Sequence, residues 1–155
     1  MDFQHCGQLL IARGQTVATA ESCTGGLLAG CITAVPGISA AFPMGVVTYS
    51  NEAKMQLLQV PAQTLHDHGA VSVETAKAMA AGLRELSKAD YCLAVTGIAG
   101  PDGGSTEKPV GLVYIGLAQL RGTQVREYRF AGDRAAVRTQ TCEAAIALLA
   151  AALAE

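Results

Sequence analysis

A short segment between an apolar strand-like run and an apolar helix-like run holds several side chains that could do chemistry. Glu21, Ser22, Cys23 and Thr24 offer a carboxylate, two hydroxyls and a thiol, and the pair Gly25-Gly26 follows at once. Hydroxyls and thiols act as nucleophiles when a neighbouring base takes their proton. Glycines let another group approach the backbone closely, and the free amides of a helix start attract an anion or a developing oxyanion. The segment therefore has the residue types of a nucleophilic site, but several side chains compete for the role.

The two hydroxyls also have a simpler interpretation. Ser22 and Thr24 are residue types that cap helix N-termini by accepting a hydrogen bond from an amide of the first turn. The segment offers two hydroxyls for one cap, so capping by one is compatible with catalysis by the other, and we expect Thr24 to be the cap. Cys23 is the rival nucleophile, because a helix N-terminus lowers the pKa of a thiol.

Lys54 is the candidate base. It is one of only four lysines and lies near the start of a predicted helix, where the helix dipole disfavours a cation and lowers the pKa of the amine. A lysine that is partly desolvated there could act as the general base for a serine. A solvated lysine on a helix surface is the alternative, and it is the commoner one. Tyr49 precedes Lys54 in the same segment and could donate a hydrogen bond or anchor the core.

A third polar segment, residues 96–105, is rich in glycine. Four glycines fall within nine residues, and Pro101-Asp102-Gly103 is a strong turn signal. Such a loop can present several backbone amides to a phosphate, although a plain wide turn explains the composition equally well. The segment matches neither GxxxxGK[ST] nor GxGxxG, so the sequence does not support a nucleoside triphosphate or dinucleotide site.

The positions of the histidines narrow the mechanisms. His5, His66 and His68 fall outside these three segments, and GxSxG is absent, which disfavours a Ser-His-Asp triad. A nucleophile in this chain would therefore need the lysine as its base. His66 and His68 are two residues apart in what we expect to be a surface turn, which is not the spacing of a metal site. We expect neither a catalytic metal nor a cofactor.

The elements that must position these residues follow from hydrophobic periodicity. Strand-like runs alternate with helix-like runs, and two strands joined by a tight turn at Arg121-Gly122 precede a final helix capped by Asp133. This order predicts a three-layer α/β/α sandwich with a mixed, mostly parallel sheet of about five strands, formed by residues 1–155 as a single domain. Ligands of such sheets bind beyond the carboxyl ends of the strands, so the three polar segments should face one crevice. The expected helices are 2–13, 24–35, 51–58 with Asn51 as its cap, 71–87 and 133–155, and the expected strands are 16–20, 45–50, 91–100, 110–120 and 123–132.

Composition limits the partners. Charged residues make up 15% of the chain and the net charge is −2, which lacks the basic excess that phosphate-backbone binding needs, so we expect no nucleic-acid partner. We find neither a signal-peptide pattern nor an apolar run of the roughly 20 residues that span a bilayer, and we expect a cytoplasmic protein without membrane contact. The five cysteines are scattered without CxxC pairs, as in proteins whose thiols stay reduced.

Six segments together resemble the CinA C-terminal domain family, in particular its stand-alone nicotinamide mononucleotide deamidases. They are AESCTGG, VTYSNEAK, HGAVS, TGIAGPDGG, KPVG and GDRAAVR, in this order. The resemblance covers nearly the whole chain. Longer members carry a molybdopterin-binding-like domain before this module, and we expect no counterpart of that domain here.

The resemblance implies an activity and a set of site residues. It implies hydrolysis of the carboxamide of nicotinamide mononucleotide to the acid and ammonia, as a step of pyridine-nucleotide salvage, without a metal and in a homo-oligomer of two or more copies. By motif, Ser22 would be the nucleophile and Lys54 its base, with Tyr49 nearby. Arg138 of GDRAAVR would face the same pocket. The other residues implied to bind the substrate are Thr24, Gly25, Gly26, Thr96, Gly97, Gly100, Asp102, Gly103 and Gly104.

A second class of function stays open. Two hydroxyls followed by glycines would also suit a non-catalytic module that binds a nucleotide or phosphate, with an accessory role in competence or DNA damage. Such a module has no need of a lysine beside Ser22. Glu21 could in addition balance the positive charge of a pyridinium substrate.

Overall fold

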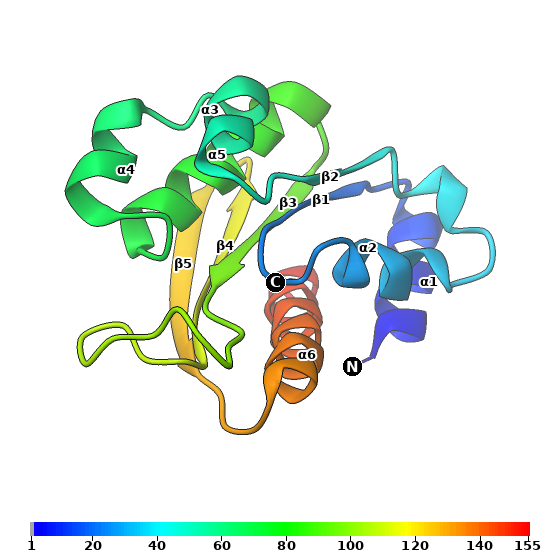
Figure 1. Cartoon of the computed structure of the whole chain (residues 1–155). Helices are drawn as coiled ribbons and strands as arrows, with labels where there is room; N and C mark the ends of the chain where they lie inside the picture. The colour runs from blue at the N-terminus through cyan, green and yellow to red at the C-terminus, as the bar shows by residue number, and fades with distance from the viewer. Residues whose placement is uncertain (1) are drawn as a thin grey trace.

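The computed structural model describes residues 2–155 and shows a five-stranded sheet between two layers of helices (Figure 1). The predicted three-layer α/β/α sandwich is therefore confirmed. In chain order the elements are α1 (Phe3–Arg13), β1 (Val17–Glu21), α2 (Leu27–Thr33), the 3₁₀ turn η1 (Ile38–Ala40), β2 (Met44–Val47), α3 (Asn51–Leu58), α4 (Ala62–His68), α5 (Val73–Ser87), β3 (Tyr91–Gly97), β4 (Leu112–Gln119), β5 (Gly122–Arg129) and α6 (Arg134–Leu153).

The sheet is mixed, and its strand order is β2-β1-β3-β4-β5. The strands β2, β1 and β3 run parallel to one another, whereas β4 is antiparallel to both of its neighbours, β3 and β5. The carboxyl ends of β1, β2 and β3 therefore meet at one edge of the sheet. The predicted hairpin is present, with Gln119 paired to Gly122 across the turn.

Two apolar cores lie on the two faces of the sheet. Figure 1 shows α3, α4 and α5 on one face and α1, α2 and α6 on the other. Successive residues of β3 alternate between these cores: Leu93 and Val95 belong to the core under α6, and Cys92 and Ala94 to the core under α5. This period-two alternation is the ordinary geometry of a strand that is buried on both faces.

Several element ends differ from the expectation. The second helix begins at Leu27 rather than near Thr24, and Ser50 rather than Asn51 caps α3, accepting a hydrogen bond from the amide of Ala53. His66 and His68, which we expected in a surface turn, lie instead in the last turn of α4. The prediction of Asp133 as the cap of α6 is confirmed, because its carboxylate accepts from the amide of Ala136 at 2.9 Å.

Helix α6 corrects the expectation that the chain has no apolar run long enough to span a bilayer. By length and composition alone its 20 residues could cross a membrane, although 56% of the apolar window is buried inside the structure. It packs against α1, α2, β3 and β4, as core helices do.

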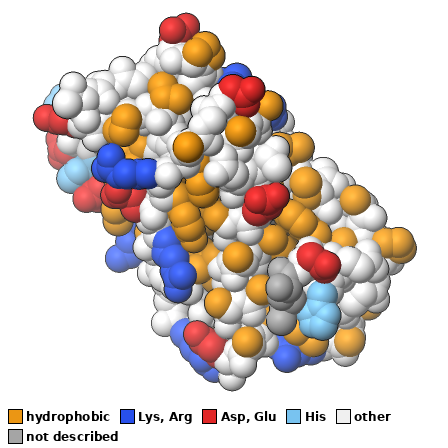
Figure 2. Space-filling model, turned by 90° about the horizontal axis from the view of Figure 1, so that it is seen from below, with side chains coloured by type: hydrophobic (Ala, Val, Ile, Leu, Met, Phe, Trp, Pro, Cys, Tyr) orange, Lys and Arg blue, Asp and Glu red, His pale blue; other side chains and the backbone are white. Residues whose placement is uncertain are grey.

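Figure 2 shows acidic and basic side chains interspersed on the face seen from below, where neither sign forms a continuous patch.

Candidate active site

The alternation of β1 determines which way Ser22 points. Ala18 and Ala20 face the core under α5, whereas Glu21 turns to the opposite face, toward α2. The strand geometry continues one residue beyond β1, because the amide of Ser22 donates to the carbonyl of Val95 at 3.0 Å. Ser22 therefore points to the same face as Ala20, where α3 lies.

Lys54 meets Ser22 from the first turns of α3. Its Nζ lies 3.0 Å from Oγ of Ser22, 2.8 Å from the carbonyl oxygen of Thr48 and 3.4 Å from that of Tyr49. The two carbonyls accept two N–H groups of the amine, and the third position of Nζ faces the serine hydroxyl. Lys54 is 1% exposed and Ser22 is 9% exposed. Burial lowers the pKa of Lys54, because a charged amine loses its hydration there.

The loop between β2 and α3 is fixed at both ends. The amide of Thr48 donates to the carbonyl of Glu21 at 2.8 Å, which attaches the loop to the end of β1. The Ser50 cap then sets the start of α3, four residues before Lys54. These contacts hold the carbonyls of Thr48 and Tyr49 beside the amine, so the position of Lys54 follows from the backbone of its own segment.

The glycine-rich loop after β3 forms the opposite wall. At the end of β3, where this loop begins, Thr96 Oγ1 donates to the carbonyl of Ala70 at 2.8 Å, which ties the strand end to the segment before α5. Gly97 has no room for a side chain, since a Cβ there would lie 2.6 Å from Cγ2 of Val113. Together the three strand ends enclose a cavity of about 290 Å³, near the lower end for small-molecule sites. Its lining residues are Ser22, Cys23, Tyr49, Lys54, Ala70, Val71, Thr96, Gly97, Ile98, Ala99, Gly100, Asp102, Gly103 and Arg134.

Arg134 lies at the rim of this cavity. Its guanidinium donates to the carbonyl of Gly100 at 2.9 Å and to Oη of Tyr49 at 3.1 Å, so it joins two of the three loops. The Tyr49 side chain is 59% exposed and its hydroxyl is engaged with Arg134 rather than with the Ser22–Lys54 pair. The sequence analysis missed Arg134 although it belongs to GDRAAVR, the segment from which we chose Arg138.

The site brings together residues from the segments that carried the resemblance. It places a buried lysine beside a serine at a strand end, and a glycine-rich loop lies opposite. A sequence model described as the CinA C-terminal domain matches residues 3–153. The chain belongs to the CinA C-terminal domain family. A CinA-like protein of Geobacter sulfurreducens is 57% identical over 139 residues, which are 90% of this chain and 34% of that protein. The chain thus spans about a third of the length of the curated relatives it matches.

Solved structures of CinA proteins share the whole fold. A CinA superfamily protein from Klebsiella pneumoniae 700603 superposes with a TM-score of 0.94 at 41% identity, over 98% of this chain and 95% of that one. The competence/damage inducible protein of Agrobacterium tumefaciens gives 0.92 at 43% identity, over 100% and 97% of the two chains. The fold of the family accordingly extends over nearly the entire chain.

Some predicted site residues lie beside the cavity of this CinA domain rather than in its lining. They are Thr24, Gly25, Gly26, Gly104 and Arg138. The φ angles of Gly25 and Gly26 are +56° and +105°, so the turn itself requires glycine. The amide of Gly25 donates to the carbonyl of Ser22 at 3.0 Å and is therefore engaged within the turn. Arg138, which we expected to face the pocket, instead donates to the carbonyl of Thr24 at 2.9 Å.

Glu21 has the capping role that we expected of Thr24. Its carboxylate is fully buried and accepts hydrogen bonds from the amides of Leu28 at 2.7 Å and Ala29 at 3.0 Å, in the first turn of α2. The hydroxyl oxygen of Thr24 has no hydrogen-bond partner within residues 2–155. The expectation of a Thr24 cap is thus wrong, and so is that of Glu21 balancing a charge on the substrate, because Glu21 faces away from the cavity.

Cys23 is a poor nucleophile in this environment. Burial raises the pKa of its thiol to about 11, so the reactive thiolate is disfavoured at neutral pH. The side chain packs in the core formed with α1, α2 and α6, whereas Oγ of Ser22 contacts Nζ of Lys54. The geometry therefore favours Ser22 over Cys23 as the group that a base can activate.

Proposed function

We propose that this CinA domain hydrolyses the carboxamide of nicotinamide mononucleotide to nicotinate mononucleotide and ammonia, in the cytoplasm, as a step of pyridine-nucleotide salvage. The observation that carries the proposal is the 3.0 Å contact between Oγ of Ser22 and Nζ of the buried Lys54. An amide is a weak electrophile with a poor leaving group, so its hydrolysis needs an activated nucleophile and a proton donor. One lysine beside one serine can supply both.

In the first step Oγ of Ser22 attacks the carboxamide carbon while the uncharged amine of Lys54 takes the hydroxyl proton. The carbonyl oxygen becomes an oxyanion, which needs donors that are already in place. The backbone amide of Cys23, a residue of the cavity lining, donates to no other residue in the part of the chain that the structure describes, and we assign this role to it. Because two carbonyls already hold Lys54, the new proton occupies the position that faces the reacting atoms.

In the second step the proton on Lys54 passes to the departing nitrogen and the carbon–nitrogen bond breaks. Ammonia leaves, and the acyl group remains as an ester on Ser22. A water molecule then attacks this ester while Lys54 takes one of its protons. The proton returns to Ser22 as the carbon–oxygen bond breaks, which frees the carboxylic acid and restores the pair. Each proton that enters the cycle is accounted for by Lys54, so no histidine is required.

Two features of the substrate, its pyridinium ring and its phosphate, support this choice of substrate. The positive pyridinium ring withdraws electrons from the carboxamide, which lowers the activation that the protein must supply. At the rim of the cavity, the Arg134 guanidinium is suited to a phosphate, for which a planar set of N–H donors is a favoured partner. A mononucleotide carries both features, whereas free nicotinamide carries neither the phosphate nor the pyridinium charge.

The test of this proposal is ammonia release by the unmodified protein. We expect release from nicotinamide mononucleotide and much less from free nicotinamide at equal concentration. Ser39→Ala and Lys77→Ala replace an exposed serine and an exposed lysine, the residue types of Ser22 and Lys54. They serve as control variants and should release ammonia like the unmodified protein. Calorimetric binding of the mononucleotide without ammonia release would instead favour the non-catalytic nucleotide-binding module.

A further inference from the structure

The candidate site carries two opposite charges besides the serine–lysine pair. Asp102 provides the carboxylate among the lining residues and Arg134 provides the guanidinium. Burial shifts the pKa of Lys54 downward and that of Cys23 up to about 11, in each case toward the uncharged form. Besides the Ser22–Lys54 pair and Cys23, the ionisable side chains of the lining are thus one carboxylate, Asp102, and one guanidinium, Arg134.

These two groups form no ion pair with each other among the described residues. Arg134 directs its N–H groups to Gly100 and Tyr49, and within residues 2–155 Asp102 has neither an ion-pair partner nor a side-chain hydrogen bond. The loop that carries Asp102 is anchored two residues earlier, where Gly100 accepts from Arg134. Asp102 lines the cavity and is exposed, so its carboxylate is available to a ligand.

Glu21 cannot supply the same charge, although it precedes Ser22 directly. Its two carboxylate oxygens accept from Leu28 and Ala29 on the opposite face of the sheet, and none of its surface is exposed. The negative charge that a ligand can reach from the lining is that of Asp102.

We infer that Asp102 is a specificity-determining residue that selects a ligand with a positively charged ring beside the reacting carboxamide. The inference rests on the proposed function, in which that ring is a pyridinium. Asp102 and Arg134 then match the two charges of one zwitterionic ligand, with the ring near the carboxylate and the phosphate near the guanidinium. A ligand of the same shape with a neutral ring gains nothing from Asp102.

The expected effect of Asp102 on the affinity for the ligand is modest, because Asp102 is exposed to solvent. Two unit charges about 4 Å apart in bulk water change an affinity by a factor of about five. We therefore expect the carboxylate to favour the cationic ring by about fivefold, and by more where the bound ligand excludes water from the pair.

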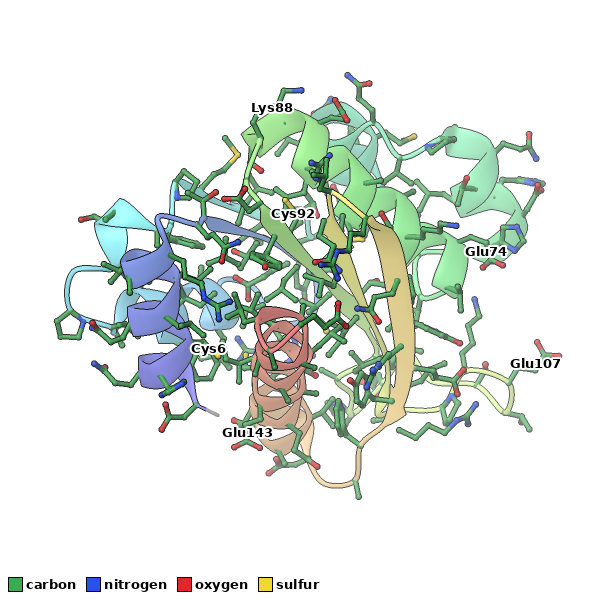
Figure 3. The ribbon with its side chains drawn as sticks, turned by 180° about the vertical axis from the view of Figure 1, so that it is seen from behind. Cys6, Glu74, Lys88, Cys92, Glu107 and Glu143 are labelled. Carbon is green, nitrogen blue, oxygen red and sulfur yellow. The ribbon has the colours of Figure 1, made fainter. Side chains whose placement is uncertain are left out.

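The experiment measures binding to the Ser22→Ala protein, in which no turnover obscures the equilibrium. Two probes are titrated by calorimetry: nicotinamide mononucleotide, and benzamide riboside 5′-phosphate, which has the same shape and a neutral ring. Each is measured with and without Asp102→Asn. The matched control is Glu107→Gln on the same loop, because Glu107 is exposed and lies outside the cavity lining. Figure 3 shows it at the outer end of that loop, pointing away from the sheet.

Asp102→Asn should raise the Kd of the cationic mononucleotide about fivefold and leave that of the neutral analogue unchanged, while Glu107→Gln changes neither. An equal effect on both probes, or on neither, would overturn the role of Asp102 and leave the proposed function standing. Failure of the Ser22→Ala protein to bind either probe, together with no ammonia release by the unmodified chain, would contradict the proposed function as well.

Discussion

The Nζ of Lys54 lies 3.0 Å from Oγ of Ser22, while the carbonyls of Thr48 and Tyr49 take its other hydrogen bonds. The amine is buried among groups that accept protons in hydrogen bonds but carry no negative charge. The carbonyls hold the amine in place, and burial lowers its pKa, which favours the uncharged amine that a serine needs from a base.

Replacing the base should abolish most of the activity without unfolding the protein. Lys54→Met keeps the length of the side chain and removes the amine, so kcat/KM for the mononucleotide should fall by about 10² to 10⁴, the usual contribution of a general base. Lys77→Met on the exposed face of α5 is the control and should keep full activity. Steady-state ammonia release measures both, and a Lys54→Met protein as active as the control would remove Lys54 from the mechanism.

The pH dependence of the reaction should follow Lys54. Burial lowers its pKa from the ordinary value of 10.5, and the base works only when uncharged. Activity should therefore rise with pH through a midpoint below 10.5 and then level off. A bound pyridinium disfavours a second positive charge nearby, so the midpoint in kcat should lie below that in kcat/KM. A rate that does not change with pH across this range would contradict the assignment.

The same shift links stability to pH. The folded-state pKa of Lys54 is depressed, so its contribution to the free energy of unfolding is fully present above pH 10.5 and is lost as pH falls through the folded-state pKa. Lys54→Met lacks this titration. Urea unfolding at several pH values should show the variant gaining stability relative to the unmodified protein as pH falls. A difference that stays constant with pH would show that Lys54 titrates alike in the folded and unfolded chains.

Glu21 should matter for stability more than for binding. Glu21→Gln keeps one acceptor for the amides of Leu28 and Ala29 and loses the other, which should cost about 1 to 3 kcal/mol of unfolding free energy. Because Ser22 is its neighbour, kcat should fall while KM changes little. Glu143→Gln, at an exposed position of α6, is the matched control. Wild-type stability in Glu21→Gln would show that the cap is dispensable.

The two arginines of GDRAAVR should separate in kinetics. Arg134→Ala should raise KM for the mononucleotide more than for nicotinamide riboside, which lacks the phosphate. Arg138 donates to the carbonyl of Thr24 beneath the turn, so Arg138→Ala should lower kcat for both substrates. If Arg138→Ala shows the KM effect that depends on the phosphate and Arg134→Ala shows the loss of kcat with both substrates, the phosphate partner is Arg138.

Much of the site could be predicted from residue types and their order. Polar segments follow three strands that the periodicity indicates, and parallel strands bring their carboxyl ends together, which places Ser22 near Lys54. The cap of α2 could not be predicted, because Glu21 reaches amides seven and eight residues away in a different element. Arg134 and Arg138 are four residues apart and lie on the same face of α6, about one turn apart, so choosing between them required the position of the start of α6 relative to the sheet.

The identity of the nucleophile is the central claim, and ammonia release by two neighbouring variants tests it most directly. Ser22→Ala and Cys23→Ala are assayed side by side with saturating nicotinamide mononucleotide, after circular dichroism shows both to be folded. The geometry predicts that Ser22→Ala falls to background while Cys23→Ala keeps most of its activity. Full activity in Ser22→Ala together with loss in Cys23→Ala would contradict it.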